Sequence, residues 1–305
     1  MGAFINNLKY RYTTASMPMK LVYINIAVFV MLRVAGVVCF FAGVDPMMFL
    51  KWIELPSSVD VLARTPWTML TYMVAHYDVF HILFNMLVLY WFGIMFLDYF
   101  TPKQFVGLYI LGGLGGGLLY LLAFLLPTLA GTHTWLIGAS ASVMAIVIAI
   151  SVRAPHYKMN LLFLGAVSLK WIAIAYVAID LLSVTGENMG GHVAHLGGAI
   201  VGALFTLLLN RRTDITRPVN WVIDSIANAI DRANNSLARK QAKRAQTKSN
   251  NAPKSAPRDT NRQPSGMMSQ EDEATLDIIL DKIKKSGYAS LTEDEKRRLF
   301  QVSKK

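Results

Sequence analysis

The sequence is poor in cysteine and in charge. Cys39 is the single cysteine in 305 residues, which excludes an intrachain disulfide and any metal cluster built from several thiolates. Charged residues make up 16% of the chain, hydrophobic residues make up 54%, and the mean hydropathy is +0.39. Soluble domains carry roughly 25% charged residues. The composition therefore predicts an integral membrane protein and excludes an ordinary soluble domain.

Most of the net charge lies in the C-terminal part of the chain. Residues 211–305 contain 20 Lys and Arg against 12 Asp and Glu, which accounts for +8 of the total +11. A basic segment can bind nucleic acid, but this one lacks a series of aromatic residues on which bases would stack. We therefore expect the lipid bilayer as a partner, and no nucleic acid.

Apolar runs predict six membrane-spanning helices, because roughly 20 apolar residues cross the hydrocarbon core. The expected spans are residues 21–44, 79–97, 104–126, 135–152, 171–184 and 190–209. The connection at 45–75 is amphipathic and should lie in the interface without crossing it. The glycines within 112–117 should let helices pack closely, since no strand precedes them and no Lys-Ser/Thr follows.

Lysine and arginine are distributed unequally between the two sides. The positive-inside rule makes the richer side cytoplasmic, so the sequence predicts a multi-pass protein of the cell membrane with both termini cytoplasmic. Alternating connections place Lys51 and Arg64 on the poorer side, and on the richer side Lys9, Arg11, Lys20, Lys103, Arg153, Lys158, Lys170, Arg211, Arg212 and Arg217.

Three spans carry polar residues near their outer ends: His81 and Asn85 in the second, Ser140 in the fourth, and His192 and His195 in the sixth. Each alone is compatible with helix packing. Polar groups inside a membrane are costly, however, and usually face a bundle interior or a water-filled cavity. Their common depth predicts a cavity open to the outside.

The residue types in this cavity are those of a serine hydrolase. Gly198 and Gly202 form a small-residue ridge on the sixth span. If this ridge packs on the small face of the fourth span, which contains Gly138, Ala141 and Ala145, His195 reaches Ser140. A serine and an imidazole make a nucleophile and its general base.

The same cavity would hold donors for an oxyanion. The Asn85 amide, the His81 ring and the backbone N–H of Ser140 are the expected donors. No Asp or Glu stands at the depth needed to complete a triad, so we expect a Ser/His dyad.

Together these motifs resemble the rhomboid family of intramembrane serine proteases. The matches are His81-Ile-Leu-Phe-Asn85, Gly138-Ala-Ser140 and Ala194-His-Leu-Gly-Gly198 with Gly202. The resemblance covers about residues 20–210 and implies an all-α, six-span bundle that cleaves single-span membrane proteins near the outer face. It implies Ser140 as nucleophile, His195 as general base, and Asn85 and His81 as oxyanion donors. We expect no cofactor and no metal.

The sequence departs from the family pattern at three positions. Ala141 follows the nucleophile where the family often has Gly, and this should tighten local packing. Met144 stands where many members have an aromatic residue, and its sulfur could contact the histidine instead. Thr68 follows Trp67 in the first outer loop, where the family has Arg.

We expect other ionisable residues in the span region to have structural and not catalytic roles. His76 should brace the first outer loop, and His133 and His156 should be solvated. His192 and His195 have a spacing that suits a metal, but with no carboxylate or thiol at that depth we do not expect one. Asp180, late in the fifth span, is given no catalytic role.

The chain outside the span region is expected to form four segments: a cytosolic N-terminus at 1–20, a juxtamembrane amphipathic helix at 211–235, a disordered basic linker at 236–271 and a small cytosolic helical hairpin at 272–305. In the hairpin, apolar residues recur at helical spacing up to Gly287, and Thr292 with Glu295 predicts a capping box. Its expected role is docking to a cytosolic partner or self-association.

Two other functions use the same residues. A catalytically inactive relative could bind membrane clients, although it would be expected to lack the Ser or the His. A small-solute channel or transporter could use the polar cavity, but it would more often show repeat symmetry or broken helices.

Overall fold

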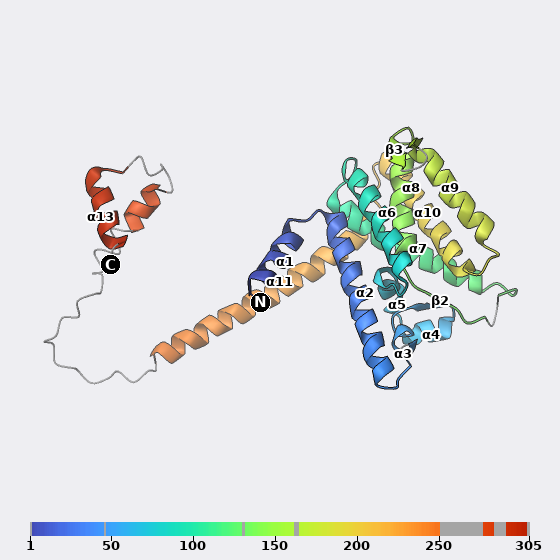
Figure 1. Cartoon of the computed structure of the whole chain (residues 1–305), viewed down its shortest axis with the longest axis horizontal. Coiled ribbons are helices and arrows are strands. Elements are labelled where there is room, and N and C mark those ends of the chain that lie inside the picture. The colour runs from blue at the N-terminus through green and yellow to red at the C-terminus, as the bar shows by residue number, and fades with distance from the viewer. Residues whose placement is uncertain are drawn as a thin grey trace. The chain divides into compact units, whose positions relative to one another are not determined.

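The computed structural model describes residues 2–45, 47–129, 132–161, 165–250, 277–283 and 291–303. The chain divides into two compact units, residues 1–236 and 237–305. The first unit is a bundle of helices with two short antiparallel strand pairs (Figure 1). The mainly helical structure agrees with the all-α prediction.

Helix α8 (Ser140–Arg153) lies at the centre of the first unit. Its residues from Ala141 to Ser151 are all buried. The helices packed around it are α6 (Val79–Leu97), α7 (Pro102–Phe124), α9 (Leu169–Ser183) and α10 (Met189–Asn210) (Figure 1). A helix that is apolar on every side is stable where other helices cover every side, which explains why this apolar run lies in the middle.

Glycines allow α7 to pack closely on α8 and α10. A β-carbon at residue 112 would clash with the side chain of Ala145, and one at residue 116 would clash with the side chain of Ala141. The packing role predicted for the glycines of residues 112–117 is therefore confirmed. The start of α7 is fixed by a capping box, in which the side chains of Thr101 and Gln104 each accept a hydrogen bond from the other's backbone N–H.

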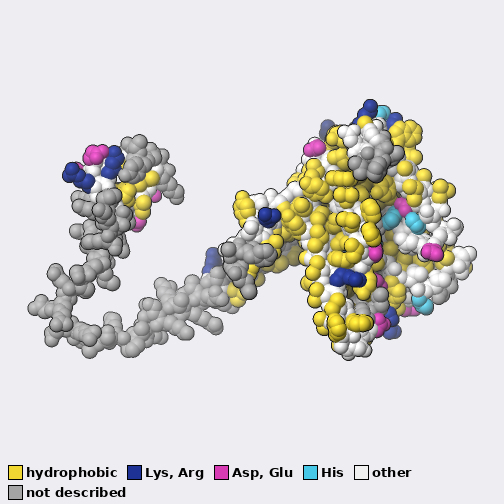
Figure 2. Space-filling view, in the orientation of Figure 1, with side chains coloured by type: hydrophobic (Ala, Val, Ile, Leu, Met, Phe, Trp, Pro, Cys, Tyr) yellow, Lys and Arg dark blue, Asp and Glu magenta, His cyan; other side chains and the backbone are white. Residues whose placement is uncertain are grey.

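Among the described residues, four helices are long and apolar enough to cross a membrane: α2 (Met17–Phe41), α6, α7 and α10. They match four of the six expected spans. Helix α2 exposes apolar side chains along much of its length, including Val30, Val34 and Val38, and Figure 2 shows hydrophobic side chains covering the face on which α2 lies. Such a surface suits contact with lipid.

The fourth expected span is wrong at its beginning. Residues Trp135–Leu136 form strand β2, and the helix begins only at Ser140. The reason is Gly138, whose φ of +126° is incompatible with a right-handed helix. Helix α8 has 14 residues and α9, which covers the fifth expected span, has 15.

The connection between α2 and α6 is ordered by short elements: α3 (Met47–Leu50), β1 (Leu55–Pro56), α4 (Val59–Arg64), α5 (Thr68–Thr71) and the 3-10 helix η1 (Tyr72–Val74). Strand β1 pairs antiparallel with β2, with Leu55 opposite Leu136. The Trp67 ring stacks on Trp52 at 6.2 Å between centroids, and its Nε1 donates to the Trp52 carbonyl at 2.9 Å. The loop is thus anchored with Thr68 in place of the family's Arg.

The other connections and the helices at the unit's ends are simple. Strands β3 (Lys158–Leu161) and β4 (Gly165–Ser168) form an antiparallel pair between α8 and α9. Helix α1 (Gly2–Thr14) precedes α2, and α11 (Arg217–Asn250) follows α10.

The prediction of a disordered linker from residue 236 is wrong for residues 236–250. These residues continue helix α11, because Ala, Arg, Lys and Gln favour helix. Residues 251–271 lie outside the described part of the chain.

In the second unit, a short helix at residues 277–283 and helix α13 (Glu293–Ser303) are described. The predicted capping box is present: the Thr292 N–H donates to Glu295 at 2.7 Å, and the Glu295 N–H donates to the Thr292 hydroxyl at 3.3 Å. Lys282 donates to both carboxylate oxygens of Glu295 at 2.9 Å, which joins the two helices. The turn expected around Gly287 falls outside the described residues.

Candidate active site

Ser140 is the first residue of the central helix. Ala139 is the N-cap, so the backbone N–H groups of the first turn of α8 have no partner within the helix. The Ser140 side chain is half-buried. A hydroxyl at this position is next to N–H donors that have no partner within the helix and next to the positive end of the helix dipole, both of which favour a nearby anion.

Three contacts fix the backbone that leads into Ser140. Strand β2 pairs with β1, the Gly138 N–H donates to the Tyr72 carbonyl at 2.9 Å, and the Ala139 N–H donates to Nε2 of His76 at 3.3 Å. The His76 side chain is completely buried. Burial lowers the pKa of His76 to about 4, and the neighbouring His81 ring contributes to this. His76 is therefore neutral at pH 7 and can accept this bond, which confirms its predicted bracing role.

Helix α10 packs directly against the first turns of α8. A β-carbon at Gly198 would clash with the carbonyl oxygen of Ala141, and one at Gly202 would clash with that of Ala145. This confirms the predicted contact between the two small-residue faces. His195 lies one turn before Gly198, at i−3 and therefore on the same side of the helix. Its ring accordingly lies at the level of the start of α8.

Helix α6 supplies the other two candidate residues. The carboxylate of Asp78 caps α6 by accepting from the His81 N–H at 2.7 Å. The His81 ring fills the space in which a β-carbon of residue 138 would lie, at 2.8 Å from Nε2. The Asn85 side chain is buried, and its amide donates one hydrogen bond to the His81 carbonyl at 2.9 Å. An amide group has two N–H donors, and the second has no hydrogen-bond partner among the described residues.

All four predicted residues line one cavity of about 410 Å³. Ser140 contributes from α8, His195 from α10, and Asn85 and His81 from α6. Within the part of the chain that the structure describes, no hydrogen bond joins the Ser140 hydroxyl to His195. Serine–histidine pairs are often longer in unliganded enzymes and tighten when substrate binds.

Residues that were not predicted also line this cavity. Trp135, Leu136 and Ile137 come from the segment before the helix, and Tyr176 comes from α9. Met144, the replacement for the family's aromatic residue, lies on the cavity wall. It packs in a small apolar cluster with Ile148 and Ala199.

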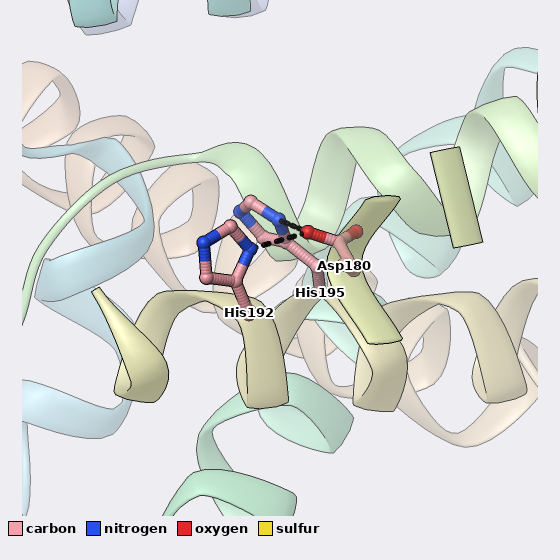
Figure 3. Close-up of side chains that lie close together, drawn as sticks. All are labelled: Asp180, His192 and His195. Atoms are coloured by element: carbon pink, nitrogen blue, oxygen red, sulfur yellow. Dashed lines mark hydrogen bonds and ion pairs between the residues drawn. The ribbon is translucent and has the colours of Figure 1, made fainter. Parts of the chain in front are cut away.

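The structure corrects the prediction that no carboxylate stands at the depth of the dyad. Oδ1 of Asp180 lies 2.8 Å from Nδ1 of His195 and 2.8 Å from Nδ1 of His192 (Figure 3). Asp180 is buried, with 4% of its surface exposed. It was passed over because sequence spacing does not reveal which face of α9 meets α10. The available signal was its charge inside an apolar segment, which is costly unless it has a partner or a function.

The correction also affects the metal prediction. Asp180, His192 and His195 each offer one ligand atom, and these atoms lie within 4.8 Å of one another. Among the described residues, these three side chains form the group whose ligand atoms are close enough together to hold a metal ion. Each Nδ1, however, is at hydrogen-bonding distance from the same carboxylate oxygen, which is the geometry of two N–H donors sharing one acceptor. His133 and His156 are exposed, as expected.

Comparison with protein families adds two findings. A model of the rhomboid domain matches residues 63–212, which include α6 to α10 and all four candidate residues. A model for a family of unknown function (DUF6576) matches residues 269–305, the region of the expected hairpin.

Curated relatives match in the same region. The presenilin-associated rhomboid-like protein A, mitochondrial, of Danio rerio is 31% identical over 134 residues, which are 43% of this chain and 34% of that protein. RHOMBOID-like protein 12, mitochondrial, of Arabidopsis thaliana is 33% identical over 150 residues, 45% of this chain and 44% of that protein. The presenilin-associated rhomboid-like protein, mitochondrial, of Homo sapiens is 26% identical over 138 residues, 44% of this chain and 35% of that protein. The chain thus spans less than half the length of these relatives.

Proposed function

Because the chain belongs to the rhomboid family, we propose that it is an intramembrane serine endopeptidase that cleaves single-span transmembrane proteins. One observation carries the proposal. Ser140, His195, Asn85 and His81, which come from three helices far apart in sequence, line a single cavity of about 410 Å³. Packing alone does not require four polar side chains to converge on one cavity inside an apolar bundle.

The reaction divides peptide hydrolysis into two steps. In the first, the Ser140 hydroxyl attacks the scissile carbonyl carbon while its proton passes to Nε2 of His195. As the C–N bond breaks, His195 gives this proton to the leaving amine, and an acyl group remains on Ser140. In the second, water attacks the acyl group, its proton passes to His195, and the proton returns to the Ser140 oxygen as the acid leaves.

Negative charge develops on the carbonyl oxygen in both steps. The second amide N–H of Asn85, a ring N–H of His81 and the backbone N–H of Ser140 are the proposed donors to this oxygen. The start of α8 adds the favourable end of the helix dipole. Preorganised donors of this kind typically contribute 10² to 10³ in rate each, roughly.

The topology we propose has six spans, with α8 and α9 added to the four long apolar helices. Helix α8 is about 21 Å long at 1.5 Å per residue, shorter than the roughly 30 Å hydrocarbon core. If its C-terminal end, with Arg153, reaches the cytoplasmic surface, then Ser140 lies below the outer surface, where the bilayer is still apolar. A cavity is then needed to bring water to it.

We propose the cell membrane as the location, with both termini cytoplasmic, from the distribution of Lys and Arg. The relatives named above carry the word mitochondrial in their names, which makes a mitochondrial membrane the second location to test. Fractionation of the cells that express the chain distinguishes the two. For the C-terminal hairpin we propose docking to a cytosolic partner or self-association.

The proposal is tested by covalent labelling with a fluorophosphonate, which reacts with activated serines. We expect the wild-type chain in detergent to be labelled and Ser140→Ala to lose the label. His195→Ala should be labelled much more weakly, because the imidazole that activates the Ser140 hydroxyl is missing. Ser151→Ala is the matched control, because Ser151 lies on the same helix and donates to the Val147 carbonyl at 2.7 Å. A channel or an inactive client-binding protein would show no label in the wild type.

A further inference from the structure

The cluster of Asp180, His192 and His195 has a role that the Ser/His pair alone does not explain. His192 and His195 lie one turn apart on α10, and both direct Nδ1 toward Oδ1 of Asp180 on α9, each at 2.8 Å (Figure 3). Asp180 does not line the cavity, whereas the ring of His195 does. The carboxylate thus lies behind the proposed base, on the side away from the space open to substrate.

This arrangement determines which nitrogen of His195 carries the proton. A carboxylate accepts hydrogen bonds, so the Nδ1 atom that faces it must be the N–H donor. In a neutral imidazole the other nitrogen, Nε2, then has a free lone pair. That lone pair is what a general base needs in order to take the proton of Ser140. The ring is also held in one orientation by the same bond.

We propose that Asp180 is a positioning residue that fixes the tautomer and orientation of His195 and stabilises its protonated form during catalysis. The inference rests on the proposed function. Asp180 exchanges no proton in the reaction: the proton of Ser140 moves to Nε2 of His195 and on to the leaving amine, while Nδ1 keeps its own. The negative charge of Asp180 is most effective when His195 becomes an imidazolium, because the carboxylate is buried in the bundle and is poorly screened by water.

His192 determines how the carboxylate is oriented. It donates to the same oxygen as His195, and Oδ2 of Asp180 has no hydrogen-bond partner among the described residues. The two histidine rings therefore fix the position of Oδ1, the oxygen that both of them contact. The other titratable groups near the cluster are Tyr176 on α9 and His81 on α6. Neither is a carboxylate, so Asp180 is the anion that acts on His195 among the groups described around it.

The first test is kinetic, with a transmembrane peptide substrate and purified chain in detergent. For Asp180→Asn we expect kcat to fall about 10²-fold and KM to change less than about twofold. A positioned general base contributes about 10² to 10⁴ in rate, and the variant should lose part of this contribution. The rising limb of the kcat/KM profile against pH should move to lower pH, because the imidazolium has lost its anionic partner. Asp224→Asn, which removes an exposed carboxylate paired with Lys103, should leave both unchanged.

A purely structural role for Asp180 predicts a different result. The fraction of folded, labelled protein would fall, while the pH limb of the remaining activity stayed in place. That result would overturn the inference, as would an Asp180→Asn variant with wild-type kcat. Loss of activity in the wild type on chelation, restored by zinc, would instead identify the cluster as a metal site and also overturn it.

A second measurement is made on the wild-type chain and does not depend on the folding of Asp180→Asn. ¹⁵N spectra of the wild-type chain labelled at histidine should show His195 protonated at Nδ1 and free at Nε2 at pH 8, with assignment by His195→Gln. Protonation at Nε2 would contradict the inference. The proposed function fails separately, if the wild-type chain is not labelled by fluorophosphonate at all.

Discussion

The carbonyl oxygen of Ala141 occupies the space into which a β-carbon of residue 198 would point. Ala141 follows Ser140 directly, and residue 198 lies one turn after His195. The contact between Ala141 and Gly198 therefore sets how close the fourth and sixth expected spans come at the level of the candidate site. It connects the packing of two helices to the distance between nucleophile and base.

We expect Gly198→Val to lower both stability and activity. The added side chain must push α10 away from the α8 backbone, which costs about 1–3 kcal/mol for overpacking and moves His195 away from Ser140. Thermal unfolding in detergent and fluorophosphonate labelling of Ser140 measure the two effects. Ile200→Val places the same residue on the exposed side of α10 and should change neither. Wild-type labelling of Gly198→Val would contradict the link between packing and activity.

The buried His76 should make stability depend on pH below neutrality. Its pKa is lowered to about 4 by burial, from an ordinary value of 6.5. Above pH 6.5 both folded and unfolded chains hold it neutral, so its full contribution is present. As pH falls from 6.5 to 4 the unfolded chain takes up the proton first, and stability falls by on the order of 3 kcal/mol.

His76→Gln is the variant that tests this dependence. A glutamine carbonyl can still accept from the Ala139 N–H but does not titrate. The fall in unfolding temperature between pH 6.5 and pH 4 should therefore be smaller in His76→Gln than in wild type. His156→Gln, at an exposed position, should keep the wild-type slope. Equal slopes in His76→Gln and wild type would show that His76 is not the responsible group.

The sequence predicted four of the long apolar helices and the convergence of the four candidate residues on one cavity, for a physical reason. Apolar runs of about 20 residues have few alternatives in a membrane, and the parity of the spans placed His81, Asn85, Ser140 and His195 at one end of the bundle. Small residues at Gly198 and Gly202 then indicated which helices approach closely. These are properties of composition and spacing, which a single sequence carries.

The features that the sequence did not reveal depend on tertiary contacts. Helix α8 begins at Ser140 because Gly138 adopts a positive φ and Trp135–Leu136 pair with a strand about 80 residues earlier. Asp180 reaches His195 because of how α9 is rotated against α10, and the helical period of α9 alone does not fix that rotation. Contacts between residues this far apart in the sequence produce no local sequence pattern from which they could be predicted.

The pair of Lys282 and Glu295 should stabilise the C-terminal hairpin at neutral pH. The hydrogen bond from Lys282 lowers the pKa of Glu295 to about 2, from an ordinary value of 4.5. A depressed carboxyl pKa contributes stability that is present above pH 4.5 and is lost as pH falls from 4.5 toward 2. Hydrogen exchange of residues 291–303 in the full chain, corrected for intrinsic rates, should show protection at pH 7 that is lost at pH 2.

Lys282→Gln should lower this protection at pH 7 by removing the contact between the helices. Arg297→Gln is the matched control, because it removes a positive charge at an exposed position of the same helix. Equal protection in the two variants would show that the pairing of Lys282 with Glu295 does not hold the hairpin together.

The amide of Asn85 should act mainly on the transition state. Its side chain donates one N–H to the His81 carbonyl, and Asn85 lines the same cavity as Ser140. The second N–H of the amide is the proposed oxyanion donor. We expect Asn85→Ala to lower kcat about 10²-fold, with KM nearly unchanged, since an oxyanion donor binds charge that forms only during the reaction. Leu83→Ala makes a similar truncation on the exposed side of α6 and should leave kcat unchanged. An unaltered kcat in Asn85→Ala would remove this residue from the oxyanion site and leave the Ser140 N–H and His81 as its donors.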